Sequence, residues 1–554
     1  MLAESKSFLQ ATCSSPFFVF AVFPLVLFYF LREISSNRRS LPLPPGPTKL
    51  PLIGNLLAIP TSKEWDVYHS WAKKYNSDII HLGVAGTSLI ILDEVEAAQE
   101  LLDKRSIYSS RYGPTRDKDF EYELMSSIRP QLTMLTELMG WDYSFVIMKY
   151  GEKWRAHRKL AQKGFLPSAL LQFQNAELRA THTLLKRLAV YGAEYKPVDM
   201  IAEVKQMTGS IILSVAYGIE VLSENDPYIA AADAALDTFC IAARPGSFLV
   251  DAIPWLKYVP EWMPGAEFKR KAKEWRKLAR KMIEMPFETA KKNYLANNYS
   301  PSFVSNALED LDNELQNGEH RTRTREIVEE DIMSVAGALY TGGVDSTLAV
   351  ITHFVCAMLQ FPDVQHRAQE ELDKVLGSGV LPRFEDEKCL PYVTAVVKEA
   401  FRWRNVAPMG FPHMLDEEDV YNGYRIPKHS IVLPNMWAMF HDEAVYPDPD
   451  PFKPERFLNP DGSLNPDIQA PEDLVFGFGR RICPARYMAY SSIWITIASL
   501  LSAYNISKAM DEQGNIIEPS YECTSTLAYM SVPFKCSITP RNESTEEMVR
   551  QLVP

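Results

Sequence analysis

The chain has 554 residues, of which 46% are hydrophobic and 23% are charged. This composition excludes disordered, collagen-like and disulfide-dense proteins. Lys and Arg number 58 against 70 Asp and Glu, so the net charge is −12, and nucleic-acid binding, which needs a basic face, is disfavoured. The seven cysteines form no C-x-x-C pair, which disfavours both a structural zinc site and a disulfide framework.

The N-terminus begins with a long apolar segment. Residues 7–31 carry no charge, and residues 16–31 read PFFVFAVFPLVLFYFL, which is long enough to cross a bilayer. Arg32, Arg38 and Arg39 follow, and the positive-inside rule would then keep the rest of the chain in the cytosol. A cleaved signal peptide and a buried core helix are the alternatives, but no A-x-A-like cleavage site follows. We therefore predict a single-pass membrane anchor over residues 1–35.

A proline-rich linker follows at residues 36–51. Five prolines in LPLPPGPTKLP exclude a helix or a central strand and predict a stiff, extended spacer. The remainder, residues 52–554, shows no internal repeat, and we expect it to be one domain.

Helical patterns dominate that body. Residues 327–360 contain no proline, and apolar positions recur at helical spacing in residues 390–406 and 487–504. The strand-like pieces are short and lie at residues 78–84, 88–92 and 430–434. We therefore predict a mainly α protein with a small β portion. Eight Lys and Arg residues between 269 and 281 predict a basic helix, which is most often a solvated face.

The body contains none of the motifs G-x-G-x-x-G, G-x-x-x-x-G-K-[ST], G-x-S-x-G and H-E-x-x-H. A nicotinamide or flavin domain inside this chain is therefore disfavoured. Electrons for any redox chemistry would have to come from another protein.

A cysteine loop near the C-terminus reads FGFGRRICPA from Phe476 to Ala485. Its glycines would let the backbone pass close to a flat ligand. Cys483 lies just before a predicted helix, whose N-terminus favours a thiolate, and a thiolate can be an axial ligand of heme iron. Arg481 is placed to meet an anionic heme propionate. A lone cysteine is more often a small core residue, but the surrounding pattern is unusually specific.

This loop resembles the heme-binding signature of the cytochromes P450, F-G-x-G-x-R-x-C-x-G. Phe476, Gly477, Gly479, Arg481 and Cys483 match it, and Ala485 stands where the last glycine is expected. The resemblance implies the cytochrome P450 fold, with heme b between the long central helix and the helix after the loop. It also implies that Cys483 is the metal ligand and that the other matching residues bind the cofactor.

Further motifs of the same family follow in the expected order along the chain. Trp154 and Arg158 resemble the W-x-x-x-R pair that contacts heme propionates, and His413 resembles another propionate contact. The resemblance also implies a structural role for three further residues, which match E-x-x-R and the later P-E-R-F tract: Glu399, Arg402 and Arg456.

The segment Gly342-Gly343-Val344-Asp345-Ser346-Thr347 lies inside the long helical stretch. Two adjacent glycines weaken a helix, so we expect a local opening of the helix where a ligand approaches. The segment resembles the oxygen-activation motif of the family, in which Asp345 and Ser346 would be the catalytic pair that delivers protons. The family usually has threonine where this chain has Ser346.

The finer resemblance, carried by residues 137–141, 259–265 and 532–536, is to fungal microsomal members that act in secondary metabolism. It implies an endoplasmic-reticulum enzyme that depends on dioxygen and NADPH and receives electrons from an NADPH-cytochrome reductase, with cytochrome b5 as a further possible donor. Residues 111–136 form a longer region than we expect in such members. We expect the reductase to dock on a basic face formed by Lys149, Lys153, Arg155 and Lys159.

The segments expected to line the pocket are mostly apolar and aromatic, so we predict a hydrophobic substrate, a terpenoid first and an aromatic polyketide or indole second. These segments are residues 108–145, 239–248, 338–343, 406–411 and 524–529. Two alternatives remain, a heme-thiolate isomerase or dehydratase that does not use dioxygen, and a non-enzymatic heme-binding sensor. The pair Asp345 and Ser346 argues against both.

Overall fold

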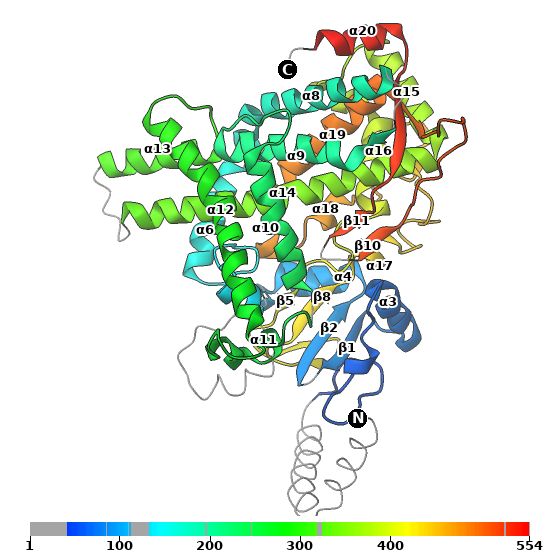
Figure 1. Cartoon of the computed structure of the whole chain (residues 1–554). Helices are drawn as coiled ribbons and strands as arrows, with labels where there is room; N and C mark the ends of the chain where they lie inside the picture. The colour runs from blue at the N-terminus through cyan, green and yellow to red at the C-terminus, as the bar shows by residue number, and fades with distance from the viewer. Residues whose placement is uncertain are drawn as a thin grey trace, which may run out of the picture.

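The computed structural model describes residues 41–552 except residues 85, 109, 112–131, 194–196, 245, 318–323 and 526–527. The predicted anchor, the first part of the linker and most of the region 111–136 lie outside the described residues. Helices fill the upper part of the molecule, and the largest sheet lies at its lower right (Figure 1). The prediction of a mainly α protein with a small β portion is confirmed.

The α-helices, in chain order, are α3 (Glu64–Tyr75), α4 (Val95–Ala98), α6 (Glu152–Gly164), α7 (Pro167–Leu170), α8 (Gln174–Ala193), α9 (Met200–Tyr217), α10 (Pro227–Ala243), α11 (Leu249–Ala252), α12 (Glu267–Leu295), α13 (Phe303–Gln316), α14 (Arg325–Gln360), α15 (Pro362–Leu376), α16 (Pro391–Trp403), α17 (Met436–Phe440), α18 (Glu472–Val475), α19 (Arg486–Ala503) and α20 (Glu543–Gln551). Short 3-10 or π turns used below are η1 (Leu56–Ala58), η2 (Gln99–Lys104), η6 (Pro254–Tyr258), η8 (Pro454–Phe457) and η9 (Gly479–Arg481).

The strands form four small sheets. The five-stranded sheet has the order β1-β2-β8-β5-β3, in which β2 and β8 are parallel and the other pairs antiparallel. The remaining sheets are β4-β12-β9, β10-β11 and β6-β7. The strands are β1 (Ile79–Val84), β2 (Thr87–Leu92), β3 (Ser110–Arg111), β4 (Val198–Asp199), β5 (His413–Met414), β6 (Asp419–Tyr421), β7 (Tyr424–Ile426), β8 (Ile431–Pro434), β9 (Tyr504–Lys508), β10 (Cys523–Ser525), β11 (Tyr529–Ser531) and β12 (Lys535–Pro540).

The long helix α14 runs through the centre of the molecule, with α8, α19 and α9 above it in Figure 1. Its sequence is apolar on nearly all sides, as expected of a helix buried all round. Among the described helices only α14 is long and apolar enough to cross a membrane, but 78% of its apolar stretch is buried inside the protein. It is therefore the core helix that the proline-free stretch predicts.

Helices α8 and α19 are joined by a polar contact within the core. The carboxylate of Glu177 on α8 accepts hydrogen bonds from Ser491 and Ser492 on α19, both at 2.7 Å. Glu177 is only 2% exposed, and this burial raises the pKa of its carboxyl from 4.5 to about 7. The folded protein therefore holds the Glu177 proton more tightly than the unfolded chain does.

Glu177 should make the stability of the protein fall as the pH rises from about 4.5 to about 7, because the ionised carboxylate is disfavoured only in the folded state. Above pH 7 the substitution Glu177→Gln should stabilise the protein by about 2–3 kcal/mol, and near pH 4.5 the gain should vanish. Melting temperatures of the two proteins between pH 5 and pH 8 measure this difference. Glu220→Gln, at an exposed position, is the control, and a gain from Glu177→Gln that does not change with pH would contradict the assignment.

Candidate active site

The cysteine loop joins α18 to α19. Its backbone folds back on itself, because the N–H of Cys483 donates to the carbonyl of Phe476 at 2.8 Å. The turn η9 lies between these two residues, and α19 begins three residues after Cys483. This arrangement places the Cys483 thiol ahead of the N-terminus of a long buried helix, as the sequence predicts.

The two glycines of the loop are needed for different reasons. Gly477 has a φ of +81°, and a Cβ built on it would meet no atom within 4 Å, so this residue borders open space. Gly479 has a φ of +55°, and its Cβ would collide with the backbone carbonyl of Leu102 in η2. Gly479 therefore makes room for the protein's own backbone, a requirement that the sequence did not indicate, and its expected role beside a flat ligand stays a prediction.

The charges around Cys483 act against the effect of its burial. Burial raises the pKa of the thiol, whereas the backbone N–H of Ala485 and the positive charges of Arg158 and Arg486 lower it. A metal ion removes the proton of a coordinating thiol outright. The same three groups would then stabilise the thiolate.

Trp154, Arg158 and Arg481 gather beside the loop. Trp154 on α6 is buried, and its indole N–H has no hydrogen-bond partner among the described residues. The Arg481 guanidinium lies 4.4 Å from the centre of the Trp154 ring and donates to the carbonyls of Phe145 and Met148. Arg158 donates to the Ile482 carbonyl at 2.5 Å, so α6 is tied directly to the cysteine loop.

His413 lies on β5, in the sheet at the lower part of the molecule. It is buried, and its Nδ1 lies 2.8 Å from the carbonyl oxygen of Tyr108, to which it can donate. His413 thus lies on a different element from Trp154 and Arg158, which lie on α6, and from Arg481, which lies in the cysteine loop.

Glu399, Arg402 and Arg456 meet at the end of α16, against η8. Arg402 Nε donates to Glu399 Oε2 at 2.7 Å and Nη2 to Oε1 at 2.8 Å, and both side chains are fully buried. Arg456 Nε adds a bond of 3.2 Å to Glu399, and Arg402 also donates to the carbonyls of Phe440 and Pro449. This network ties α16 to the segment 440–456, which precedes the cysteine loop in the chain.

The glycine pair of α14 does not open the helix. The helix is continuous from Arg325 to Gln360, and the Ser346 hydroxyl donates to the Gly342 carbonyl at 2.6 Å. A Cβ on Gly343 would lie 2.9 Å from Cδ1 of Ile212, so this glycine allows α9 to pack closely on α14. The expected local opening is therefore wrong. Gly342, whose Cβ would meet no atom within 4 Å, borders open space as Gly477 does.

Asp345 lies close to charged residues of two other helices. Burial raises the pKa of its carboxyl, the Lys205 charge on α9 lowers it, and the charges of Asp233 and Asp237 on α10 raise it. Lys205 Nζ lies 2.8 Å from Asp233 Oδ1, and both side chains are about one-third exposed. Asp345 thus lies within electrostatic range of a partly exposed ion pair between Lys205 and Asp233. The sequence analysis did not identify Lys205, Asp233 or Asp237. The i, i+4 spacing of the two aspartates could have indicated that they share one face of a helix.

The predicted basic face is larger than the sequence indicated. Lys153, Arg155 and Lys159 are exposed on α6. The Tyr150 ring lies 5.6 Å from the Arg155 guanidinium and 5.3 Å from that of Arg480, which also donates to the Tyr150 hydroxyl at 2.7 Å. Arg480 belongs to the cysteine loop, and the sequence analysis did not include it in the basic face. Its place directly before Arg481 in the sequence could have indicated a concentration of positive charge there.

The site fits a flat cofactor with anionic arms. Gly477 of the loop and Gly342 of α14 both border open space, and a thiol suited to an iron ligand lies in the loop. The unpartnered N–H of Trp154 and the two guanidinium groups of Arg158 and Arg481 match the carboxylates of heme propionates. The fold and this donor set together fit a heme-thiolate protein.

Residues 44–531 match the family described as Cytochrome P450. The chain is 44% identical over 522 residues to cytochrome P450 monooxygenase 98 of Postia placenta, and the alignment covers 94% of each protein. It is 43% identical over 517 residues to cytochrome P450 monooxygenase ple1 of Rhodocybe pseudopiperita, with 93% of each covered. It is 38% identical over 516 residues to tryptamine 4-monooxygenase of Psilocybe cyanescens, with 92% of this chain and 94% of the relative covered.

The chain belongs to the cytochrome P450 family. It is a fungal P450 monooxygenase, as its resemblance to this group predicted, and the family implies a heme-thiolate centre and a separate electron-donating reductase.

Proposed function

We propose that this protein is a membrane-anchored monooxygenase that oxidises a hydrophobic small molecule in secondary metabolism. One oxygen atom of dioxygen enters the substrate, and the other leaves as water with two electrons from NADPH and two protons. The observation that carries the proposal is the placement of Cys483 beside Arg158, Trp154 and Arg481. Cys483 Sγ would be the iron ligand of heme b at this site, and Trp154, Arg158, Arg481 and His413 would hold its propionates. The cofactor would supply the activation of dioxygen there.

Asp345 and Ser346 are proposed to deliver the protons. Asp345 holds its proton more tightly than an exposed aspartate because it is buried, and the Lys205–Asp233 pair offers an exchange path to solvent. The Ser346 hydroxyl donates to the carbonyl of Gly342, one turn earlier on α14. Gly342 borders open space, so the hydroxyl lies on the stretch of α14 next to that space.

The variant Asp345→Asn should retain heme but turn over about 10²–10⁴-fold more slowly, because an amide cannot transfer the proton. The rate of product formation per heme, in a system reconstituted with the reductase, measures the effect. Asp363→Asn, at an exposed position of α15, is the matched control. Full activity of Asp345→Asn would exclude the proton-delivery role and favour the isomerase alternative.

The electron donor is proposed to be NADPH-cytochrome P450 reductase, with cytochrome b5 as a possible second donor. The basic face formed by Lys149, Lys153, Arg155 and Lys159, extended by Arg480, lies next to the cysteine loop. An acidic partner would be attracted to this face before contact.

Electron transfer from the reductase should slow as salt rises, because ions screen the attraction between exposed charges. The double variant Lys153→Glu/Lys159→Glu should slow reduction at low salt several-fold and remove most of the salt dependence. Stopped-flow reduction rates measure this effect, and Lys428→Glu/Lys535→Glu, at two exposed positions elsewhere, is the control. Equal reduction rates in the two double variants would show that the basic face is only a solvated surface and does not attract the reductase.

Residues 1–35 are proposed to anchor the protein in the endoplasmic reticulum membrane, with the body in the cytosol. The uncharged segment 7–31 and the arginines that follow it support this orientation. An apolar substrate that dissolves in the bilayer would be concentrated at the surface to which the enzyme is held.

The substrate is proposed to be a terpenoid first, and an aromatic polyketide or an indole second. The described residues of the expected pocket segments are rich in packed aromatic rings, such as Trp141 and Phe239, whose centres are 4.7 Å apart. One relative is named for an indole substrate, tryptamine, which supports the second class.

A panel of sesquiterpenes, aromatic polyketides, indoles and polyanions tests this proposal, with displacement of the iron-bound water followed by absorbance. We expect tight binding within the apolar classes and rejection of the polyanions, because an unpaired charge is costly in an apolar pocket. Tight binding of a polyanion, with none by terpenoids or aromatics, would contradict the proposal.

A further inference from the structure

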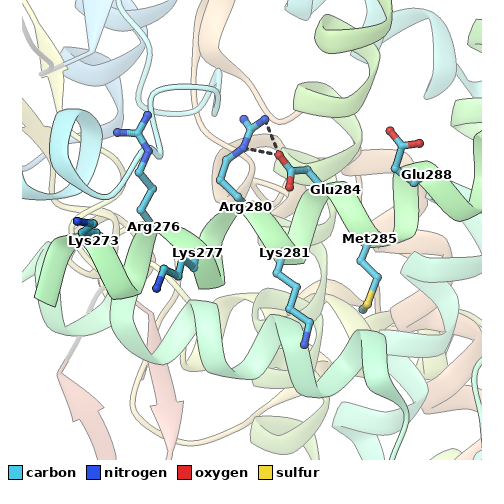
Figure 2. Close-up of a pocket in the computed structure, with 8 residues that line it drawn as sticks. All are labelled: Lys273, Arg276, Lys277, Arg280, Lys281, Glu284, Met285 and Glu288. Carbon is cyan, nitrogen blue, oxygen red and sulfur yellow. Dashed lines mark hydrogen bonds and ion pairs between the residues drawn. The ribbon is translucent and has the colours of Figure 1, made fainter. Parts of the chain in front are cut away.

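A buried histidine and a buried aspartate join α6 to α14, and the function proposed above uses neither of them. His157 Nε2 lies 3.0 Å from Asp331 Oδ1, and the two side chains are 0% and 5% exposed. Figure 2 shows a more exposed pair for comparison, Arg280 and Glu284 of α12, whose side chains are 35% and 46% exposed. Removing polar groups from water costs free energy, so a pair as deeply buried as His157 and Asp331 needs an explanation.

Helix α6 has little apolar surface with which to fix its own position. It carries five Lys or Arg among 13 residues, and its buried side chains are those of Trp154, His157 and Ala161. These three lie on one face, because they are spaced by three and then four positions. Of the three, only His157 forms a hydrogen bond with another element among the described residues. Apolar packing is non-directional, whereas a hydrogen bond restricts both distance and angle, so His157 can fix the orientation of α6.

The partner of His157 lies on a helix that is held independently of α6. Two residues before Asp331, the carboxylate of Glu329 accepts hydrogen bonds from Lys291 Nζ of α12 and from Arg325 Nε, both at 2.8 Å. Most of α14 is also buried in the core. The contact with Asp331 therefore places α6 against a fixed part of the molecule.

The two residues of α6 that are proposed to hold heme propionates lie on either side of His157 in the sequence. Trp154 comes one turn earlier, and Arg158 is the next residue and also donates to the Ile482 carbonyl of the cysteine loop. A small rotation or slide of α6 on α14 would move both side chains together. Such a movement would weaken the hold on the propionates without unfolding the helix.

We propose that His157 and Asp331 are positioning residues, which set the orientation of α6 on α14 and thereby keep Trp154 and Arg158 at the heme propionates. The pair acts through these two side chains and does not itself have to contact the cofactor. The alternative is that the pair only supports the packing of the two helices. Heme retention and fold stability would then change together. The inference rests on the heme site proposed above.

The release of heme from the full-length holoprotein to an excess of apomyoglobin, which captures free heme, tests the proposal. Asp331→Leu leaves the buried imidazole without its acceptor and should release heme about 10–100-fold faster, as expected when a group that orients the ligands of a cofactor is lost. Asp331→Asn keeps an oxygen that can accept the Nε2 proton and should release heme at close to the wild-type rate.

The double variant His157→Leu/Asp331→Leu separates orientation from packing. Replacing both partners by apolar groups can be nearly neutral for stability, so this variant should recover most of the urea unfolding midpoint that Asp331→Leu loses. It should still release heme much faster than the wild type, because no directional contact remains. If Asp331→Leu does not fold, the double variant and Asp331→Asn give the result.

The matched control is His366→Leu/Glu370→Leu, which removes an exposed pair of the same chemistry, 3.2 Å apart with side chains 73% and 66% exposed. It should leave heme release unchanged. Heme release at the wild-type rate in the double variant His157→Leu/Asp331→Leu would overturn the proposal and leave the pair a packing role. A wild-type protein that binds no heme, or that lacks the thiolate type of carbon monoxide band, would instead contradict the heme site itself.

Discussion

Replacing Cys483 by alanine is expected to abolish both turnover and the strongly red-shifted carbon monoxide band of the ferrous protein. A thiolate ligand gives that band and pushes electron density toward the iron, which favours cleavage of the dioxygen bond. The backbone N–H of Ala485 and the charges of Arg158 and Arg486 stabilise a thiolate at this position, and no other cysteine lies in the loop. Absorbance of the reduced, carbon monoxide-treated protein measures the effect.

Heme content, measured separately, shows whether Cys483→Ala loses the cofactor or only its ligand. Cys389→Ala, which removes an exposed thiol, is the matched control and should keep both the band and the activity. An unchanged spectrum in Cys483→Ala would show that another residue is the ligand.

The variant Arg402→Ala should yield little folded protein. It leaves the fully buried Glu399 carboxylate without its main partner, which typically costs about 3–5 kcal/mol. This loss is a large fraction of the stability of a typical domain. Arg402→Lys keeps the charge but cannot make both bonds to the carboxylate and both to the carbonyls of Phe440 and Pro449, so a smaller loss is expected.

The measurements are heme-loaded yield and melting temperature. Arg270→Ala is the matched control, because Arg270 and Glu267 form an i, i+3 pair of the same spacing whose side chains are 63% and 75% exposed. An exposed pair of this kind contributes about 0.5 kcal/mol or less. If Arg402→Ala and Arg270→Ala had equal melting temperatures, the buried network would not stabilise the fold.

The features that the sequence predicted are those encoded within one short segment. The proline-free apolar stretch became α14, residues 487–504 became α19, and the three strand-like pieces became β1, β2 and β8. The cysteine loop could be interpreted because its glycines, arginine and cysteine lie within ten residues of one another.

The features that the sequence did not predict depend on contacts between distant segments. A side chain at Gly343 would collide with Ile212 of another helix. A side chain at Gly479 would collide with the carbonyl of Leu102, which lies almost 380 residues earlier in the chain. The grouping of Lys205 and Asp233 near Asp345 likewise requires three helices to meet. No local pattern encodes such pairs, because the periodicity of a helix indicates which face is buried but not what covers it.

The most direct test of the central claim is an omission experiment with the full chain in membranes or nanodiscs, a fungal reductase and a candidate apolar substrate identified by spectral binding. Product is measured with the complete mixture and with NADPH, reductase or dioxygen left out in turn. The account predicts product that carries one oxygen atom from labelled dioxygen and that disappears in each omission. Product formed without dioxygen or without the reductase would contradict it and would identify an isomerase or dehydratase instead.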